Sequence, residues 1–164
     1  MVEALARANW RFVLTHPAHM LAFGFGSGLV PAAPGTAGTL ATFILYWAVA
    51  PHLAAAEYLA MVAAMFLVGI WACGVTGRAL GISDHGGIVW DEITAFMLVL
   101  FFTPPRLEWQ AVAFLVFRGF DILKPPPIRY YDQRLKGGFG VMFDDLVAAF
   151  MALIVLALGQ RLVG

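Results

Sequence analysis

Five apolar segments follow one another along this chain of 164 residues, and a proline closes three of them. The segments cover residues 38–50, 56–77, 93–103, 109–123 and 146–158. Proline lacks a backbone N–H and disfavours helix in the residue before it, so Pro51, Pro104 and Pro125 are predicted helix ends. The pattern predicts an all-α fold with Gly/Pro-rich loops, in a single compact domain over residues 1–164.

The composition indicates that lipid is part of the solvent for this fold. Hydrophobic residues make up 62% of the chain and charged residues 12%, whereas soluble domains carry about 25% charged residues. Only segment 56–77 reaches the roughly 20 residues that a helix needs to cross a bilayer. The other four segments would cross the bilayer only together with flanking residues, or they would enter it without crossing. We therefore expect a membrane-embedded or membrane-associated helical domain. The alternative is a soluble protein with a very apolar core. A chain with 62% hydrophobic residues has too few polar residues to cover the surface of a small globule, which argues against this alternative.

The positions of lysine and arginine predict which side of the membrane holds the polar loops. Four of these cations lie between residues 124 and 136, and Arg7 and Arg11 precede the first apolar segment. If successive segments pair as hairpins, the same side holds the Gly-rich stretch before residue 38, the loop 78–90 and the loop after residue 123. We expect this side to be cytoplasmic.

The acidic residues gather in these same regions. Glu3, Glu57 and Glu108 lie at segment edges, where we interpret them as solvated. The other seven are Asp84, Asp91, Glu92, Asp121, Asp132, Asp144 and Asp145. Acids in the first turn of a helix are stabilised by its dipole, which would explain one adjacent pair. Two pairs, at 91–92 and 144–145, exceed that need. Ionised carboxylates beside a low-dielectric region are unfavourable unless paired or bound to a cation, and clustered carboxylates suit Mg²⁺.

Arg118, Asp121 and Lys124 place three charges at intervals of three residues around the end of the fourth apolar segment. On a continuous helix, all three would fall within one arc of about 120°. One interpretation is an Arg118–Asp121 ion pair that locks two helices together. The other is an acid that binds metal beside cations that bind phosphate, because arginine and lysine match phosphate oxygens.

Glycine-rich stretches precede two of the apolar segments, at residues 24–39 and 137–140. Such a loop entering a helix can present backbone N–H groups to an anion, or it can be a tight turn that needs glycine for close packing. His85 is either a general acid or base or a loop histidine. Cys73 lies in the most apolar segment, where a thiolate is disfavoured. No Gly-x-Ser-x-Gly elbow, cysteine-phosphatase loop or aspartyl-phosphate motif is present. With no obvious protein nucleophile, metal-assisted attack by water is the mechanism left for hydrolysis.

Four strings together resemble the phosphatidylglycerophosphatase A family of bacteria. They are GFGSGL with PGTAGT at 24–39, DHGGIVWDE at 84–92, FRGFDILKPPPIR at 117–129 and GGFGVMFDD at 137–145. The resemblance covers roughly residues 17–159. It implies an all-α enzyme of the bacterial inner membrane that uses Mg²⁺. The implied reaction removes the terminal phosphate of phosphatidylglycerophosphate to give phosphatidylglycerol, with the substrate held in the bilayer.

The resemblance marks positions, and residue chemistry suggests their roles. Expected catalytic residues are Asp84, His85, Asp91, Glu92, Asp121 and Asp145. Expected metal ligands are Asp91, Glu92, Asp121, Asp144 and Asp145. Expected substrate-binding residues are Ser27, Thr36, Thr39, Arg118, Lys124 and Arg129.

Three other functions fit parts of the pattern. Intramembrane charges and Gly-broken helices suit a small transporter or channel subunit. The cations at 124–136 suit a scaffold that binds anionic lipid. A phosphatase for another membrane phosphomonoester fits as well as the implied one. Acids and bases balance at ten each, so no bulk field favours a nucleic-acid partner, and the sequence carries no signal for oligomeric state.

Overall fold

A computed structural model describes residues 8–163, and these residues form helices without a β-strand. Glu3 and Arg7 lie outside the described residues. The α-helices are α2 (Trp10–Val13), α3 (Pro17–Ala22), α4 (Pro34–Val49), α5 (Ala55–Leu80), α6 (Trp90–Phe102), α7 (Leu107–Leu123), α8 (Ile128–Arg134) and α9 (Gly137–Val163). Two 3₁₀ helices, η1 (Gly24–Leu29) and η2 (Ala50–His52), flank α4. The expected all-α fold is confirmed.

Each of the five apolar segments forms one long helix, in the order α4, α5, α6, α7 and α9. The predicted proline stops are confirmed, because α4 ends just before Pro51 and α6 just before Pro104. The exposed Glu57 lies in the first turn of α5, where its Oε2 accepts the backbone N–H of Ala54 at 2.8 Å. Gly81 ends α5 with a φ of 72°, a conformation that glycine adopts without strain.

The last helix is longer than the sequence predicts. The glycines at 137–140 form the first turn of α9 instead of a loop. They do so because α9 starts directly against α5, where a Cβ on Gly138 would lie 1.9 Å from the Ile70 carbonyl oxygen. α9 therefore joins α5 as a second helix long and apolar enough to cross a membrane. Asp144 and Asp145 lie in its third turn, so the dipole explanation for this pair is wrong.

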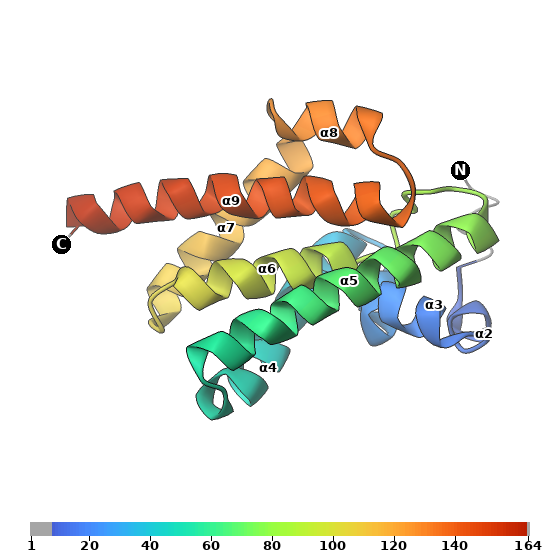
Figure 1. The fold of residues 1–164 in the computed structure, drawn as a ribbon, viewed down its shortest axis with the longest axis horizontal. Coiled ribbons are helices and arrows are strands. Elements are labelled where there is room, and N and C mark those ends of the chain that lie inside the picture. Colours follow the sequence, from blue (N-terminus) through green and yellow to red (C-terminus); the bar gives the residue numbers. More distant parts are fainter. Residues whose placement is uncertain (1–7, 164) are drawn as a thin grey trace.

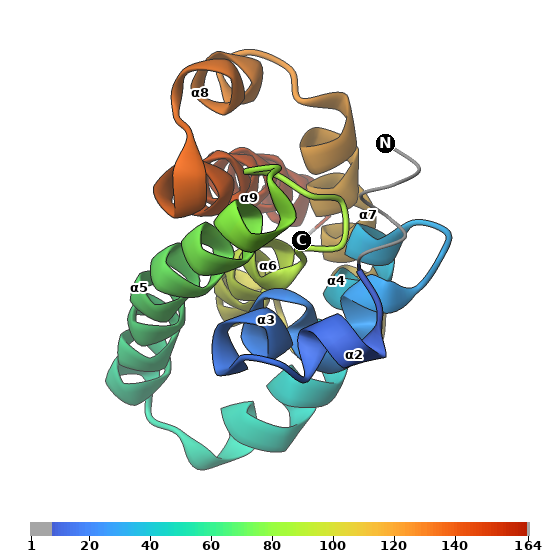
Figure 2. The ribbon, with the colours of Figure 1, turned by 90° about the vertical axis from the view of Figure 1, so that its right-hand side faces the viewer.

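α6 is the centre of the bundle. It packs against α4, α5, α7 and α9, and Figure 2 shows it surrounded by these helices. Phe96 of α6 stacks on Phe117 of α7 with ring centroids 5.5 Å apart, and both rings are fully buried. This packing fixes the start of α6 in position, because close-packed cores leave little freedom for rigid displacement.

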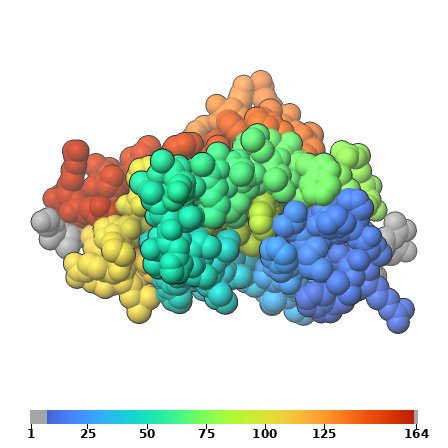
Figure 3. Space-filling view, turned by 60° about the horizontal axis from the view of Figure 1, so that its bottom comes forward, coloured from blue at the N-terminus to red at the C-terminus, as the bar shows by residue number. Residues whose placement is uncertain are grey.

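The outer surface of the bundle is strongly apolar. Exposed large hydrophobic side chains include Ile44 on α4, Leu67 on α5, Leu115 on α7 and Ile154 on α9. On the face in Figure 3, α5 runs along the surface, and α6 is mostly covered by its neighbours. Exposed apolar surface this extensive is typical of contact with lipid or a partner, in agreement with the expected membrane association.

The polar loops meet at one end of the molecule, where α5 ends and α9 begins (Figure 1). There η1 touches the loop after α5 so closely that a Cβ on Gly28 would lie 2.0 Å from the Gly87 carbonyl oxygen. Lys124, in the loop after α7, reaches Asp144 of α9. The three regions predicted to share one side of the helices therefore do share one end of the fold.

Candidate active site

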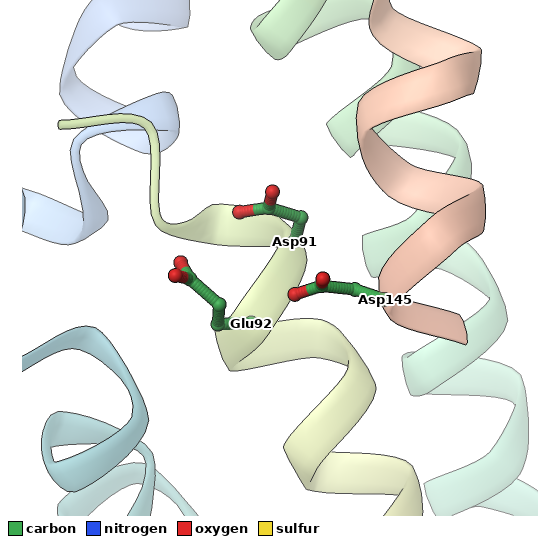
Figure 4. Close-up of side chains that lie close together, drawn as sticks. All are labelled: Asp91, Glu92 and Asp145. Carbon is green, nitrogen blue, oxygen red and sulfur yellow. The ribbon is translucent and has the colours of Figure 1, made fainter. Parts of the chain in front are cut away.

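Three carboxylates from two helices converge at this end. Asp91 and Glu92 lie in the first turn of α6, and Asp145 comes from α9. The Val89 N–H donates to the Ala22 carbonyl at 2.8 Å, which ties the start of α6 to α3. One oxygen from each carboxylate lies within 4.8 Å of the other two, and Figure 4 shows the side chains directed into a common space. We call these three residues the carboxylate cluster.

The carboxylate cluster contains the kind of atoms that a cation would satisfy. Asp91 and Asp145 are 7% and 3% exposed. Asp91 Oδ1, Glu92 Oε2 and Asp145 Oδ2 are buried and have no hydrogen-bond partner among the described residues. Buried polar atoms are almost always paired in folded proteins. Three neighbouring carboxylates that each have an unpartnered buried oxygen fit a divalent cation with oxygen ligands.

The electrostatics of the carboxylate cluster also favour a bound cation. Burial raises the pKa of Glu92 to about 8, and the negative charge of Asp121 adds to this. Burial likewise raises the pKa of Asp91, and the charges of Glu92 and Asp84 raise it further. Without a cation the preference of these groups shifts toward the protonated form, because like charges in a desolvated site repel one another. A bound cation would reverse that preference.

Arg118 of α7 links the carboxylate cluster to Asp121. Its Nη1 donates to Glu92 Oε1 at 3.3 Å and also to an Asp121 oxygen. The side chains of Arg118 and Glu92 are 11% and 12% exposed. The Arg118–Asp121 ion pair that the sequence allowed is therefore present. The Nε of Arg118 is a buried donor without a partner in the described part of the chain, and so one N–H of the guanidinium makes no hydrogen bond within the fold.

Lys124 does not continue the charged face of α7. The helix ends at Leu123, and Lys124 has φ 43° and ψ 55°. The single helical arc predicted for the three charges is wrong, because Pro125 disfavours the helical conformation at Lys124. The Lys124 ammonium instead donates to Asp132 of α8 at 2.7 Å and to Asp144 of α9. Lys124 thus connects the end of α7 to α8 and α9. Asp121 and Asp144 each face a cation and lie outside the carboxylate cluster.

The start of α4 touches the carboxylate cluster through Gly35. A Cβ at this position would lie 1.9 Å from Glu92 Oε1 and 3.0 Å from an Arg118 nitrogen. The close approach explains why the Pro-Gly-Thr string at the start of α4 has glycine at its centre. The alternative that these glycines serve close packing is therefore confirmed at this position.

Gly35→Ala is expected to abolish most of the phosphatase activity that the sequence resemblance implies, while leaving the helical content unchanged. The added methyl group has to displace the Glu92 carboxylate and with it the ion pair to Arg118. The control is Gly119→Ala on α7, where a Cβ meets no atom within 4 Å. That variant should keep full activity and gain up to about 1 kcal/mol of stability, because alanine favours helix. Circular dichroism and phosphate release measure both. Full activity of Gly35→Ala would contradict the assigned contact.

His85 and Asp84 lie in the loop after α5. His85 is buried, its Nδ1 accepts the Gly87 N–H at 3.0 Å, and its ring packs against Phe23. These contacts support the loop-histidine interpretation. Asp84 is exposed on the same loop and acts on Asp91 through its charge. His85 also lines a pocket of about 550 Å³ beside Pro34, at the start of α4.

The four remaining sequence-predicted binding residues lie in different environments. Ser27 donates to the Gly24 carbonyl at 2.9 Å within η1. Thr39 is fully buried and donates to the Gly35 carbonyl at 2.8 Å, so its hydroxyl serves α4 itself and has no open surface. Thr36 is half-buried beside Gly35, and Arg129 is exposed on α8. Of these four residues, Thr36 is the one that directly follows Gly35, which touches the carboxylate cluster.

Sequence reasoning assigned no role to two residues that the structure places at the site. Asp132 accepts a hydrogen bond from the Lys124 ammonium. The sequence signal for this role is that Asp132 is one of the clustered acids and lies close to Lys124 along the chain. Thr94 follows one turn after Asp91, is 2% exposed, and has a buried hydroxyl oxygen without a partner among residues 8–162. A threonine in an apolar helix gives no such signal, because its hydroxyl ordinarily bonds within the helix.

Fold and site together define an all-α protein with a buried carboxylate centre suited to a divalent cation. Residues 20–160 match the phosphatidylglycerophosphatase A family. The phosphatidylglycerophosphatase A of Haemophilus influenzae is 49% identical over 144 residues, which cover 87% of this chain and 88% of that protein. The phosphatidylglycerophosphatase A of Escherichia coli is 40% identical over 146 residues, covering 88% and 84%.

The chain belongs to the phosphatidylglycerophosphatase A family and is a phosphatase. This membership decides against the transporter and scaffold alternatives. A third relative, from Bacteroides thetaiotaomicron, is 35% identical over 152 residues, covering 88% of this chain and 94% of that protein. It is provisionally named a phosphatidylinositol-3-phosphatase. No solved structure matches this chain.

Proposed function

We propose that this protein hydrolyses the terminal phosphomonoester of phosphatidylglycerophosphate, with Mg²⁺ held by Asp91, Glu92 and Asp145. The observation that carries the proposal is the carboxylate cluster itself: one oxygen from each carboxylate lies within 4.8 Å of the other two, and each carboxylate has a buried oxygen without a partner among the described residues. The names of the relatives from Haemophilus influenzae and Escherichia coli support the substrate. Mg²⁺ prefers carboxylates together with water and substrate phosphate, which fits a site with three carboxylate ligands.

A cation bound there would supply the positive charge that stabilises phosphoryl transfer, which is extremely slow without a catalyst. The carboxylates would hold that cation, and Arg118 would donate its Nε–H to a phosphate oxygen. Its Nη1 remains bonded to Glu92 and Asp121, and so the guanidinium is already oriented. In the reaction, a water oxygen bonds to phosphorus and the phosphorus–oxygen bond to the glycerol breaks. A proton passes to that glycerol oxygen, giving phosphatidylglycerol and inorganic phosphate.

The proposed setting is the bacterial inner membrane, with the site on the cytoplasmic side. α5 and α9 are long and apolar enough to cross it, and both meet at the carboxylate cluster end of the fold. Arg129, Arg134 and Lys136 are exposed beside that end, and cationic loops favour the cytoplasm. A phospholipid could keep its acyl chains in the bilayer while its phosphate reaches the polar loops.

A second candidate is hydrolysis of a different membrane phosphomonoester. The Bacteroides thetaiotaomicron relative favours it, because its provisional name assigns the phosphate of an inositol lipid. The carboxylate cluster and Arg118 recognise the phosphoryl group alone. The rest of the headgroup must therefore decide between the two substrates.

Phosphate release from three lipids in mixed micelles tests the proposal. The lipids are phosphatidylglycerophosphate, phosphatidic acid and phosphatidylinositol 3-phosphate, each with Mg²⁺ and with EDTA. We expect release from phosphatidylglycerophosphate to exceed the others by at least about tenfold and to stop in EDTA, because binding of the remote headgroup contributes to turnover. Preference for the inositol lipid would establish the second candidate. Undiminished release in EDTA would overturn the metal requirement.

A further inference from the structure

An apolar groove opens on the outside of the bundle between α5, α6 and α9. It encloses about 360 Å³, within the range of small-molecule binding sites. Thr94 is the one polar side chain in its lining. Leu59, Ala63 and Leu67 follow each other at four-residue intervals along α5 and are exposed, so the groove is open at the surface of the fold.

The groove starts next to the carboxylate cluster. Thr94 follows Asp91 by one turn on α6, and Met142 precedes Asp145 by one turn on α9. Residues three apart on a helix are surface neighbours. The lining then continues along all three helices away from the polar end, to Leu98 on α6, Leu146 on α9 and Leu59 on α5. The groove therefore leads from the carboxylate cluster toward the apolar part of the bundle.

The hydroxyl of Thr94 indicates a ligand with one polar group at that end. Thr94 is 2% exposed, and its Oγ1 has no hydrogen-bond partner in the described part of the chain. A buried hydroxyl without a partner is unfavourable. An ester oxygen of a glycerolipid would accept its proton, while the hydrocarbon chain beyond the ester would match the remaining lining.

We propose that this groove binds one acyl chain of the phospholipid substrate, with the ester near Thr94 and the methyl end toward Leu59. This inference rests on the proposed function, because it requires a phospholipid substrate. Two of the groove walls are α5 and α9, the helices long and apolar enough to cross a membrane. The chain can therefore enter sideways from the bilayer without passing through water, and burial of its methylenes favours the bound state.

Filling the groove tests the assignment. Ala63→Trp places a large side chain at the exposed edge of the groove, and Ala64→Trp places the same side chain on an exposed position of α5 outside the lining. The substrates are dioleoyl phosphatidylglycerophosphate in lipid nanodiscs and its deacylated, water-soluble headgroup. For Ala63→Trp we expect kcat/KM for the lipid to fall by about tenfold or more, the equivalent of losing two buried methylenes. Headgroup hydrolysis should stay unchanged, and Ala64→Trp should match wild type on both.

Equal loss on the lipid and the headgroup, or equal effects of the two variants, would overturn the groove assignment. A wild-type protein that hydrolyses neither compound would instead overturn the proposed function. Photocrosslinking separates the two, since it needs no turnover. Phosphatidylglycerol with a diazirine near the methyl end of one chain is irradiated in nanodiscs and mapped by mass spectrometry. Label concentrated around Leu59 and Ala63, and lost in Ala63→Trp, supports the assignment. Uniform label, or a crosslinked second copy covering the groove, contradicts it.

Discussion

Asp145→Asn is expected to reduce phosphate release by on the order of a thousandfold while the protein stays folded, and Asp91→Asn should do the same. Each variant removes one of three ligand carboxylates. Asp145 Oδ2 and Asp91 Oδ1 have no hydrogen-bond partner among the described residues, and an asparagine keeps a side-chain oxygen that can accept, so we expect the fold to tolerate either change. In EDTA the melting temperature should stay level or rise, since the substitution relieves repulsion between buried like charges.

The matched control for these variants is Glu108→Gln. Glu108 is an exposed carboxylate paired with Arg106 at the start of α7, far along α7 from Arg118. Its activity should equal that of wild type. Phosphate release and thermal unfolding by circular dichroism, both in detergent micelles, measure the outcomes. Near-wild-type turnover of Asp145→Asn or Asp91→Asn would remove that residue from the mechanism, and a collapsed fold would show that its role is structural.

Arg118→Met is expected to lower the melting temperature by ~10 °C and to abolish activity. The substitution leaves Glu92 and Asp121 buried without their cation. Loss of one partner from a buried ion pair costs about 3–5 kcal/mol, and each kcal/mol shifts the melting temperature of a chain this size by about 2–4 °C. Activity falls as well, because the variant lacks the guanidinium that is proposed to donate to phosphate.

A second substitution separates the two roles of Arg118. Adding Asp121→Asn to Arg118→Met removes one of the stranded charges and should recover part of the lost stability without recovering activity. Arg106→Met, which breaks the exposed pair with Glu108, should change neither, because exposed ion pairs contribute little. If Arg118→Met retained the wild-type melting temperature, the ion pairs to Glu92 and Asp121 would not hold the fold together.

The sequence predicts the helices of this fold well because proline and apolar length act locally. It fails at the start of α9, where Gly137 and Gly138 favour a loop by their intrinsic propensity. The close approach of Gly138 to the Ile70 carbonyl is a tertiary contact, and it overrides that propensity. The same contact explains why the apolar run at 146–158 underestimates a helix that begins at Gly137.

The site is predictable in its membership and less so in its pairings. Alternate loops lie at the same end of the bundle, and this arrangement brings Asp91 and Asp145 together. The clustering of acids in the sequence identifies both as site residues. Spacing along one helix correctly suggests the contact of Arg118 with Asp121. It cannot reveal the bond from Arg118 to Glu92, which spans 26 residues and two helices. Lys124 leaves the predicted face because its left-handed conformation turns the chain toward α8 and α9.

Binding of Mn²⁺ to the metal-free protein, followed by electron paramagnetic resonance, tests the carboxylate cluster most directly. Mn²⁺ takes the oxygen ligands that Mg²⁺ takes and reports bound ions without any substrate. We predict saturable binding to the wild-type protein, competition by Mg²⁺, and weakening of at least about tenfold in Asp145→Asn, which lacks one ligand charge. Equal Mn²⁺ affinity of the wild type and Asp145→Asn, or no saturable binding to the wild type, would contradict a cation site at Asp91, Glu92 and Asp145.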